Sequence, residues 1–425
     1  MSLRRTRSAL QPVLICIVAW ALSGCRDEAN EATVLRFWAM GREGEVVRQL
    51  LPDFERAYPD VRVEVQQLPW TAAHQKLLTA FAGGALPDVA QLGNTWLPEF
   101  VALRAVDRVE PSLVDAGDYF SGIWQTNVVD EAAYGVPWYV DTRLLFYRRD
   151  LLTAAGYSAP PATWPEWIEM LGAIKRRGEA QHYGLLLPLN EYEPLLALAL
   201  QQDEPLLRDG NGRGNFRSDG FRRALGYYRE MFDRGLAPAT SSNQVSNLWD
   251  EFARGYFSFY ITGPWSIGEF KRRLPASLQS SWMTAPLPGP NGPGASIAGG
   301  SSLVVFSHSP RKKAAWQLVQ YLSRPDVQLR FHALTGNLPP RRSAWRDESM
   351  TRDIYAPAFR EQLERAKPAP QVPEWERIAT EMQLVAEQMV QGGRMTVDQA
   401  AAEIDRRTDR ILEKRRWLLA RKEQP

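Results

Sequence analysis

The stretch LWDEFARGYFSFYITGPWSI, residues 248–267, joins a helix pattern to a strand pattern and ends in a turn. Its first half has apolar residues at the three- and four-residue spacing of one helix face: Trp249, Phe252 and Ala253. Gly255 is suited to end this helix, and the apolar run Tyr256–Ile261 has the length of a buried strand. Trp265 follows Gly263-Pro264 on the first turn after that strand. Because ligands of open α/β sheets bind at the carboxyl ends of strands, we expect this indole to lie in a binding site.

The N-terminal part of the chain alternates strand and helix patterns. Val34–Trp38 and Val61–Val65 have strand patterns, and an amphipathic helix pattern runs between them from about Glu45 to Tyr58. Pro52 lies inside that helix and is expected to kink it. A strand, a helix and a second strand in succession predict a parallel sheet and an α/β fold.

Further along, four helices are indicated by their patterns. Trp70–Ala82 and Trp375–Met389 are both followed by a pair of glycines, and a last helix of about Val397–Leu419 ends in a basic segment. Thr163 and Glu166 have the spacing of a capping box and predict where the fourth helix begins.

Several phrases of this chain resemble those of bacterial extracellular solute-binding proteins that serve ABC sugar importers, of the maltose- and trehalose-binding type. They occur in the same order as in that family: FERAYPDVRVEV (54–65), GALPDVAQL (84–92), YGVPWYVDTRLLFYRRDL (134–151), GPW (263–265) and LTGNLPPRR (334–342). The resemblance implies a two-lobed α/β periplasmic-binding-protein fold of type II-like topology, with the lobes joined by crossing hinge strands. By family topology, lobe 1 comprises residues 34–141 and 284–333, and lobe 2 comprises residues 142–283 and 334–425.

The N-terminus resembles the signal peptide of a bacterial lipoprotein. Three arginines precede the apolar run Val13–Leu22, which is too short to span a bilayer in the mature protein. Leu22-Ser23-Gly24-Cys25 resembles a lipobox, in which Cys25 would be lipidated. We therefore expect a signal peptide over 1–24, a tether over 25–33, and a periplasmic or cell-envelope protein that is lipid-anchored to a membrane, inner or outer. The alternative is a soluble secreted protein with an incidental cysteine.

Composition and charge exclude several other functions. Loss of the signal peptide leaves 48 basic and 49 acidic residues of the original 51 and 49, a balance that argues against nucleic acid as a partner. Cys25 would be the one cysteine left, so disulfides and cysteine metal sites are excluded. The four histidines lack zincin spacing, and no G-x-S-x-G, Walker or dinucleotide-binding motif occurs. We expect no cofactor and no metal.

A sugar site needs flat apolar platforms beside fixed hydrogen-bonding groups, and indole rings provide the platforms. By resemblance and position, the expected ligand contacts are Trp38, Gln91, Asn94, Trp96, Trp138, Asp141, Arg143, Trp249, Trp265, Gly299, Gly300, Ser301 and Arg341. A core role is the alternative for each tryptophan, solvation is the alternative for Arg341, and Asp141 and Arg143 could instead pair with each other. For Trp70, Trp164, Trp316 and Trp375 we expect core or surface packing.

The resemblance implies a non-enzymatic, monomeric substrate-binding lipoprotein of an ABC importer. It would capture a sugar, a di- or oligosaccharide of maltose or trehalose type, in the cleft between the lobes by hinge closure, and deliver it to the membrane permease. One alternative is the same fold binding another solute, such as a glycerol phosphate, a polyamine or a metal chelate. A glycan-acting lipoprotein enzyme also stays open, because a carboxylate pair for glycoside hydrolysis is defined by a distance in space.

Overall fold

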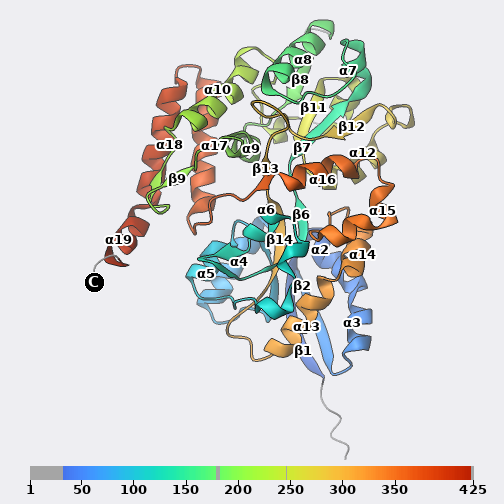
Figure 1. Cartoon of the computed structure of the whole chain (residues 1–425), viewed down its shortest axis with the longest axis vertical. Coiled ribbons are helices and arrows are strands. Elements are labelled where there is room, and N and C mark those ends of the chain that lie inside the picture. The colour runs from blue at the N-terminus through green and yellow to red at the C-terminus, as the bar shows by residue number, and fades with distance from the viewer. Residues whose placement is uncertain (1–31, 179–181, 246, 423–425) are drawn as a thin grey trace, which may run out of the picture.

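The protein has two α/β lobes stacked along its long axis (Figure 1). The computed structural model describes residues 32–178, 182–245 and 247–422. The expected signal peptide, Cys25 and the tether up to residue 31 lie outside the described residues. Within the described part, no helix has both the length and the apolar character needed to cross a membrane.

Lobe 1 is built on a five-stranded sheet at the bottom of Figure 1. The order of its strands is β2 (Val61–Leu68), β1 (Thr33–Met40), β3 (Val89–Gly93), β14 (Gly299–Val305) and β6 (Val136–Asp141). β1 runs parallel to β2 and β3, as the sequence predicts, and β14 runs antiparallel to β3 and β6. All of β3 is buried, which is typical of a strand covered on both faces.

Two layers of helices cover this sheet. They are α2 (Gly41–Val46), the 3₁₀ turn η1 (Val47–Gln49), α3 (Leu51–Ala57), α4 (Trp70–Ala82), α5 (Leu97–Ala102), α13 (Lys312–Leu322) and α14 (Pro325–Thr335). The prediction of one kinked helix over residues 45–58 is wrong, because the helical stretch is divided at Leu50. Pro52 lies in the first turn of α3, where backbone N–H groups have no partner within the helix, so a proline costs no hydrogen bond there.

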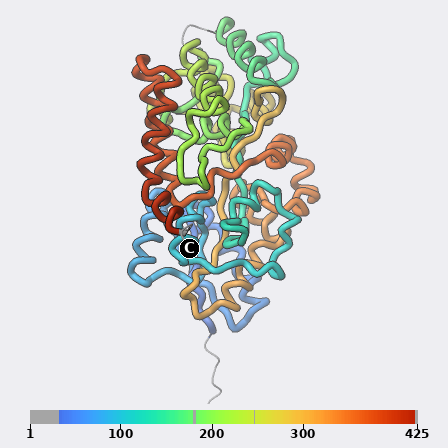
Figure 2. Tube along the Cα trace, turned by 60° about the vertical axis from the view of Figure 1, so that its left-hand side comes forward, coloured from blue at the N-terminus to red at the C-terminus, as the bar shows by residue number. Residues whose placement is uncertain are grey.

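Lobe 2 contains a four-stranded sheet in the order β12 (Trp282–Ala285), β7 (Leu144–Arg148), β11 (Phe257–Thr262) and β8 (Tyr183–Leu186). Its helices are α7 (Arg149–Ala154), α8 (Trp164–Arg177), α9 (Glu193–Leu200), α10 (Asp219–Asp233), α11 (Leu248–Arg254), α12 (Trp265–Arg273), α17 (Trp375–Gly392), α18 (Val397–Ile411) and α19 (Glu413–Lys422). α17 and α18 pack against α10 on the outer side of the lobe (Figure 2). The predicted single last helix is divided at Leu412.

The stretch 248–267 folds as its pattern predicts. α11 ends at Gly255 in the left-handed conformation, with φ of 78°, and β11 is buried along its whole length. Trp265 begins α12 directly beyond the end of β11. The capping box of Thr163 and Glu166 is confirmed at the start of α8.

The chain passes between the lobes at three places. Thr142 and Arg143 join β6 of lobe 1 to β7 of lobe 2, and the segment between β12 and β14 leads back. Ala285 still pairs with Leu145 of lobe 2, beyond the boundary expected after residue 283. The third passage runs beside β6, where the N–H of Val140 donates to the carbonyl of Leu338 at 2.9 Å.

Short elements complete the interlobe region and the surface loops. α6 (Ser121–Gln125), η6 (Arg342–Arg346), α15 (Glu348–Thr351) and α16 (Ala356–Glu364) surround the hinge, together with the strand pair β13 (Ser296–Ile297) and β15 (Ala366–Lys367). The remaining short pairs are β4 (Val128–Val129) with β5 (Ala132–Ala133), and β9 (Leu207–Arg208) with β10 (Arg213–Gly214). A hydrophobic cluster that includes Phe120 of lobe 1 and Phe146 of lobe 2 fills the space between them.

Candidate functional site

A cavity of about 550 Å³ lies between the lobes, where the strands of both sheets end. Lobe 1 and the passages between the lobes contribute Glu43, Trp70, Gly93, Asn94, Thr95, Trp96, Tyr139, Asp141, Arg143, Ile297, Ala298, Gly299, Gly300 and Asn337. Lobe 2 contributes Tyr192, Glu193, Leu196, Trp265 and Glu376. This is the position at which ligands of open α/β sheets bind.

Three indole rings form the aromatic part of the cavity wall. Trp70 and Trp96 come from lobe 1, with ring centroids 5.6 Å apart, and Trp265 comes from lobe 2. Trp70 is 37% exposed and Trp265 is 40% exposed, although large aromatic side chains are normally well covered in folded proteins. Exposed rings on opposite walls of a cavity are suited to hold a flat apolar surface between them.

Each of these indoles lies against a glycine. A Cβ atom placed on Gly263 would come within 1.9 Å of the Trp265 ring, and one on Gly41 would come within 2.9 Å of Trp70. A Cβ on Gly93 would lie 3.3 Å from the ring of Trp96, a tight contact. The rings therefore occupy space that a side chain at these positions would need, which explains in physical terms why a glycine stands at position 263.

Arg143 is the centre of a charged network on the first passage between the lobes. Its guanidinium donates to Asp141 at 3.2 Å and to Glu193 at 2.9 Å, and it lies 4.6 Å from the centroid of the Trp265 ring. Burial raises the pKa of Asp141, and Arg143 opposes this effect. Both alternatives considered for Asp141 and Arg143 are thus compatible with the geometry, since the two residues pair and also line the cavity.

The other cavity carboxylates have partners of two kinds. Glu43 accepts from Asn337 at 2.7 Å and, at 3.4 Å, from the indole N–H of Trp70, all within the same wall. Glu376 of α17 instead accepts a hydrogen bond from Thr95 on the opposite lobe. This bond links the two walls directly.

A buried polar network supports the lobe 1 wall from behind. Gln91 and Ser301 are both fully buried, and both donate to the hydroxyl of Tyr139, at 3.3 Å and 3.0 Å. Asn94 accepts from Ser302 at 3.1 Å, while its buried Nδ2 has no partner in the described part of the chain. Burial raises the pKa of Tyr139 well above its usual value, so the hydroxyl stays protonated.

Seven of the residues expected to contact ligand line this cavity: Asn94, Trp96, Asp141, Arg143, Trp265, Gly299 and Gly300. The glycine pair is explained by close packing, because a Cβ on Gly299 would lie 2.2 Å from the carboxylate of Asp141. Gly300 has a φ of +117°, which L side chains rarely adopt.

The other six expected residues do not line the cavity. Gln91 and Ser301 lie one layer behind it, and Trp138 is fully buried with its ring stacked 4.5 Å from Phe331. Trp38 is 9% exposed in the core under Lys76. Trp249 packs on Phe270, and Arg341 pairs with Asp118 at 2.6 Å.

Several cavity residues are not among the ligand contacts expected from the sequence: Glu43, Trp70, Gly93, Thr95, Tyr139, Tyr192, Glu193, Leu196, Ile297, Ala298, Asn337 and Glu376. Trp70, expected to serve in packing, begins α4 just beyond β2. Its position soon after the strand predicted at Val61–Val65 is a usable signal, of the same kind as the one that identified Trp265. Glu376 has no such signal, because it reaches the cavity from the start of a C-terminal helix.

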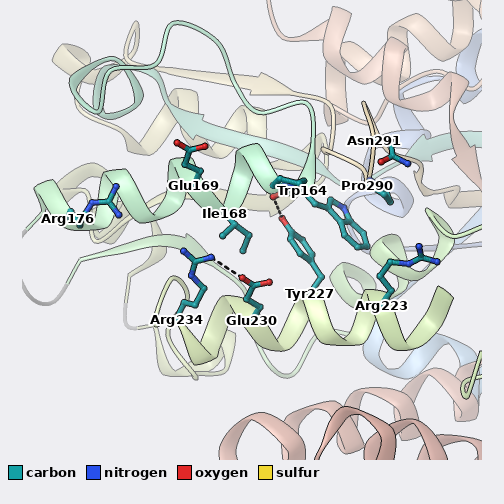
Figure 3. A pocket seen from close by; sticks show the side chains of 11 residues that line it. Trp164, Ile168, Glu169, Arg176, Arg223, Tyr227, Glu230, Arg234, Pro290 and Asn291 are labelled. Atoms are coloured by element: carbon teal, nitrogen blue, oxygen red, sulfur yellow. Dashed lines mark hydrogen bonds and ion pairs between the residues drawn. The ribbon is translucent and has the colours of Figure 1, made fainter. Parts of the chain in front are cut away.

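A second cavity, of about 610 Å³, lies on the outer side of lobe 2 between α8 and α10 (Figure 3). The rings of Trp164 and Tyr227 stack on each other there at 4.2 Å and are only 5% and 8% exposed. Glu230 and Arg234 pair with each other at 2.9 Å. Its lining comes from α8, α10 and the loop at Pro290 and Asn291, and its two rings are already stacked on each other, so this cavity lacks the facing exposed indoles of the interlobe site.

Comparison with known proteins agrees with this architecture. The profile of the family described as bacterial extracellular solute-binding protein matches residues 40–329. The solved structure of the sugar-binding protein MalE from the phytopathogen Xanthomonas citri is 56% identical, covers 92% of this chain and 100% of its own, and has a TM-score of 0.89.

Two further relatives are more distant in sequence. An uncharacterized lipoprotein of Streptomyces antibioticus is 28% identical over 88% of this chain and 87% of its own. The diacetylchitobiose binding protein DasA of Streptomyces coelicolor is 22% identical over 77% of this chain and 76% of its own. By their printed names, one of these relatives is a lipoprotein and the other is a binding protein. In the residues that the structure describes, no group of three or more His, Cys, Asp or Glu side chains could hold a metal ion. With its two-lobed fold and the match over residues 40–329, the chain belongs to the bacterial extracellular solute-binding protein family.

Proposed function

We propose that this protein captures a di- or oligosaccharide of maltose or trehalose type in the interlobe cavity by hinge closure and hands it, chemically unchanged, to an ABC permease. The observation that carries the proposal is that both lobes contribute indole rings to the cavity: Trp70 and Trp96 come from lobe 1, and Trp265 comes from lobe 2. Sugar rings have apolar C–H faces and polar edges, so they fit between indoles that are flanked by donors and acceptors.

The polar residues of the cavity support a ligand that is rich in hydroxyl groups. Asp141, Glu43 and Glu376 supply acceptors, while Asn94 and Arg143 supply donors. A hydroxyl group both donates and accepts, and can therefore pair with either kind of group. A site of this type rejects a sugar of the wrong configuration, because a buried group left unpaired costs about 1–3 kcal/mol.

The charge of the cavity favours one second candidate, a cationic solute such as a polyamine. Four carboxylates line the cavity, namely Glu43, Asp141, Glu193 and Glu376, whereas Arg143 is the one Lys or Arg side chain in the lining. An anionic phosphate ligand would meet repulsion from this lining. A polyamine would satisfy the carboxylates but would leave the three indoles with less apolar surface to cover.

We also propose that the protein is secreted and held at a membrane of the cell envelope by lipidation of Cys25. The support is the Leu22-Ser23-Gly24-Cys25 sequence after an apolar run, together with the relative from Streptomyces antibioticus that is named a lipoprotein. The permease subunits are then the membrane partner, and the monomer with its bound sugar is the form they would receive.

Isothermal titration calorimetry of the chain without residues 1–25 tests the proposal. The panel consists of maltose, trehalose, maltotriose, diacetylchitobiose, glycerol 3-phosphate and spermidine. We expect one or more of the sugars to bind with a dissociation constant of micromolar or below, and sugar recovered after binding to be unchanged. Binding of spermidine without sugar binding would favour the second candidate, and release of cleaved sugar would replace the proposal by an enzyme.

A further inference from the structure

We infer that the hydroxyl of Tyr139 is a fixed hydrogen-bond donor to the ligand and selects for an acceptor oxygen at that point of the cavity. Gln91 and Ser301 would act as positioning residues that fix the direction of this donor. The inference rests on the proposed function, since it concerns how the same cavity distinguishes one sugar from another.

The orientation of the Gln91 amide is set by the backbone. The N–H of Met40, at the end of β1, donates to Oε1 of Gln91 at 2.8 Å. A backbone N–H can only donate, so the atom that it meets must be the amide oxygen and not the amide nitrogen. Nε2 therefore faces the other way, and it donates to Ser301 Oγ at 3.1 Å and to Tyr139 Oη at 3.3 Å.

The Ser301 hydroxyl continues this chain of hydrogen bonds. Ser301 Oγ accepts from Gln91 and donates to Tyr139 Oη at 3.0 Å. The Tyr139 oxygen thus accepts two hydrogen bonds, one from Gln91 and one from Ser301. Both acceptor positions of the phenol oxygen are then occupied, and its own hydrogen is the remaining group that can make a bond.

The Tyr139 hydrogen has no acceptor within the residues that the structure describes, although the residue lines the cavity. The carboxylates of Glu43 and Asp141 lie close enough for their charges to raise the pKa of Tyr139, which places the hydroxyl near the acidic part of the cavity. Because Tyr139 is only 5% exposed, water can solvate its hydroxyl poorly. A ligand oxygen would satisfy a donor that is otherwise left unpaired.

The chemical consequence concerns the class of group that the ligand presents. A hydroxyl, a glycosidic oxygen or an acetamido carbonyl can accept from Tyr139, whereas a C–H at the same place cannot. Loss of one such bond in a buried site corresponds to a roughly 10- to 100-fold change in affinity. Tyr139 would therefore add to selectivity for the ligand without contributing to its aromatic stacking.

A double-mutant cycle tests the inference, with the panel sugar that binds the wild-type protein most tightly as the probe. Tyr139→Phe keeps the ring and removes the donor, so we expect the dissociation constant to rise roughly 10- to 100-fold. Gln91→Glu at pH 8 places a carboxylate among three donors, which would hold it ionised and draw the Tyr139 hydrogen away from the cavity. We expect a similar loss of affinity, and no further loss when both changes are combined.

Tyr228→Phe is the matched control, because Tyr228 is buried in lobe 2 and does not line the cavity. Its affinity for the probe sugar should equal that of the wild-type protein. If Gln91→Glu fails to fold by circular dichroism, Ser301→Ala takes its place in the cycle. It should weaken binding in the wild-type background and have no effect in the Tyr139→Phe background.

Two results would overturn the inference while leaving the proposed function intact. One is sugar binding by Tyr139→Phe with an unchanged dissociation constant. The other is a loss of affinity in the double variant, Tyr139→Phe with Gln91→Glu, that equals the sum of the losses in the two single variants. Gln91 would then act on the fold and not through Tyr139. If no panel sugar binds the wild-type protein, the proposed function is contradicted and the inference falls with it.

Discussion

The two walls of the interlobe cavity are built differently. On the lobe 1 wall, Glu43 is bonded to Asn337, Asn94 to Ser302, and Tyr139 to Gln91 and Ser301, so the polar groups are held from behind. On the lobe 2 wall, Trp265 stands 40% exposed at the first residue of a helix, and Glu376 is bonded to Thr95 of the other lobe. Lobe 1 thus presents a preformed surface, whereas the groups of lobe 2 have fewer supporting contacts within their own lobe, and under the proposed hinge closure they would complete their contacts as the lobes come together.

This difference indicates how binding energy would be divided between the lobes. A preorganised wall loses little side-chain freedom on binding, so it can select the ligand. A wall that contributes only in the closed state makes the ligand's affinity higher for that state, which is what drives closure. The following predictions test this division, from the largest expected effect to the smallest.

The largest effect is expected from Trp265→Ala. Trp265 is the single indole on the lobe 2 wall, so its loss should weaken the binding free energy for sugar by about 2 kcal/mol and raise the dissociation constant roughly thirtyfold. Trp96→Ala is the matched change on lobe 1, where Trp70 lies 5.6 Å away and remains. We expect it to cost less, and calorimetry on both variants measures the difference.

The melting temperature of Trp265→Ala should stay near that of the wild-type protein, because the ring is exposed and lies outside the core. Equal losses from the two variants would mean that the walls share the stacking evenly. An unchanged dissociation constant for Trp265→Ala would remove this residue from the site.

A smaller effect is expected from Thr95→Val, which removes the hydrogen bond to Glu376 across the cavity and keeps the shape of the side chain. Because this bond exists only when the walls are near each other, its loss should open the ligand-free protein. Such a bond contributes about 0.5–1.5 kcal/mol, so the affinity for sugar should fall roughly two- to tenfold. Small-angle scattering of the ligand-free variant should give a larger radius of gyration than the wild-type protein, and an identical radius would speak against a closing contact.

A last prediction concerns stability and not ligand affinity, at Glu191, which precedes the lobe 2 wall residues Tyr192 and Glu193. Burial, with a further contribution from Glu193, raises the pKa of Glu191 from its usual 4.5 to about 7. Since the folded state binds this proton more tightly than the unfolded state, the stability of the protein should fall as pH rises from about 4.5 to about 7. Glu191→Gln removes this dependence.

Melting curves at pH 5 and pH 8 measure the Glu191 effect. The variant should be more stable than the wild-type protein at pH 8, and the difference should be smaller at pH 5. A difference that is the same at both pH values would mean that ionisation of Glu191 does not oppose folding.

The fold was predictable from local patterns, and the site only in part. The spacing of Trp249 and Phe252, the left-handed position of Gly255 and the capping box at Thr163 are local features, and the structure contains all three. The division of the helix at Leu50 was missed because Pro52 is compatible with two outcomes, a kink inside a helix or the first turn of a new one.

The site depended on facts that local patterns do not contain. Trp70 and Trp138 are the same residue type, yet Trp70, which follows β2, is 37% exposed in the cavity, and Trp138, which lies inside β6, is fully buried. What separates them is the neighbouring space: Trp70 lies on Gly41, and Trp138 packs on Phe331. Such contacts between distant segments are set by the assembled fold.

The structure of the protein crystallised with the panel sugar that binds most tightly tests the central claim most directly. We predict that the sugar lies in the interlobe cavity, in contact with Trp265 of lobe 2 and with Trp70 or Trp96 of lobe 1. A sugar that touches one lobe alone, or that occupies the outer cavity beside Trp164 and Tyr227, would contradict the account.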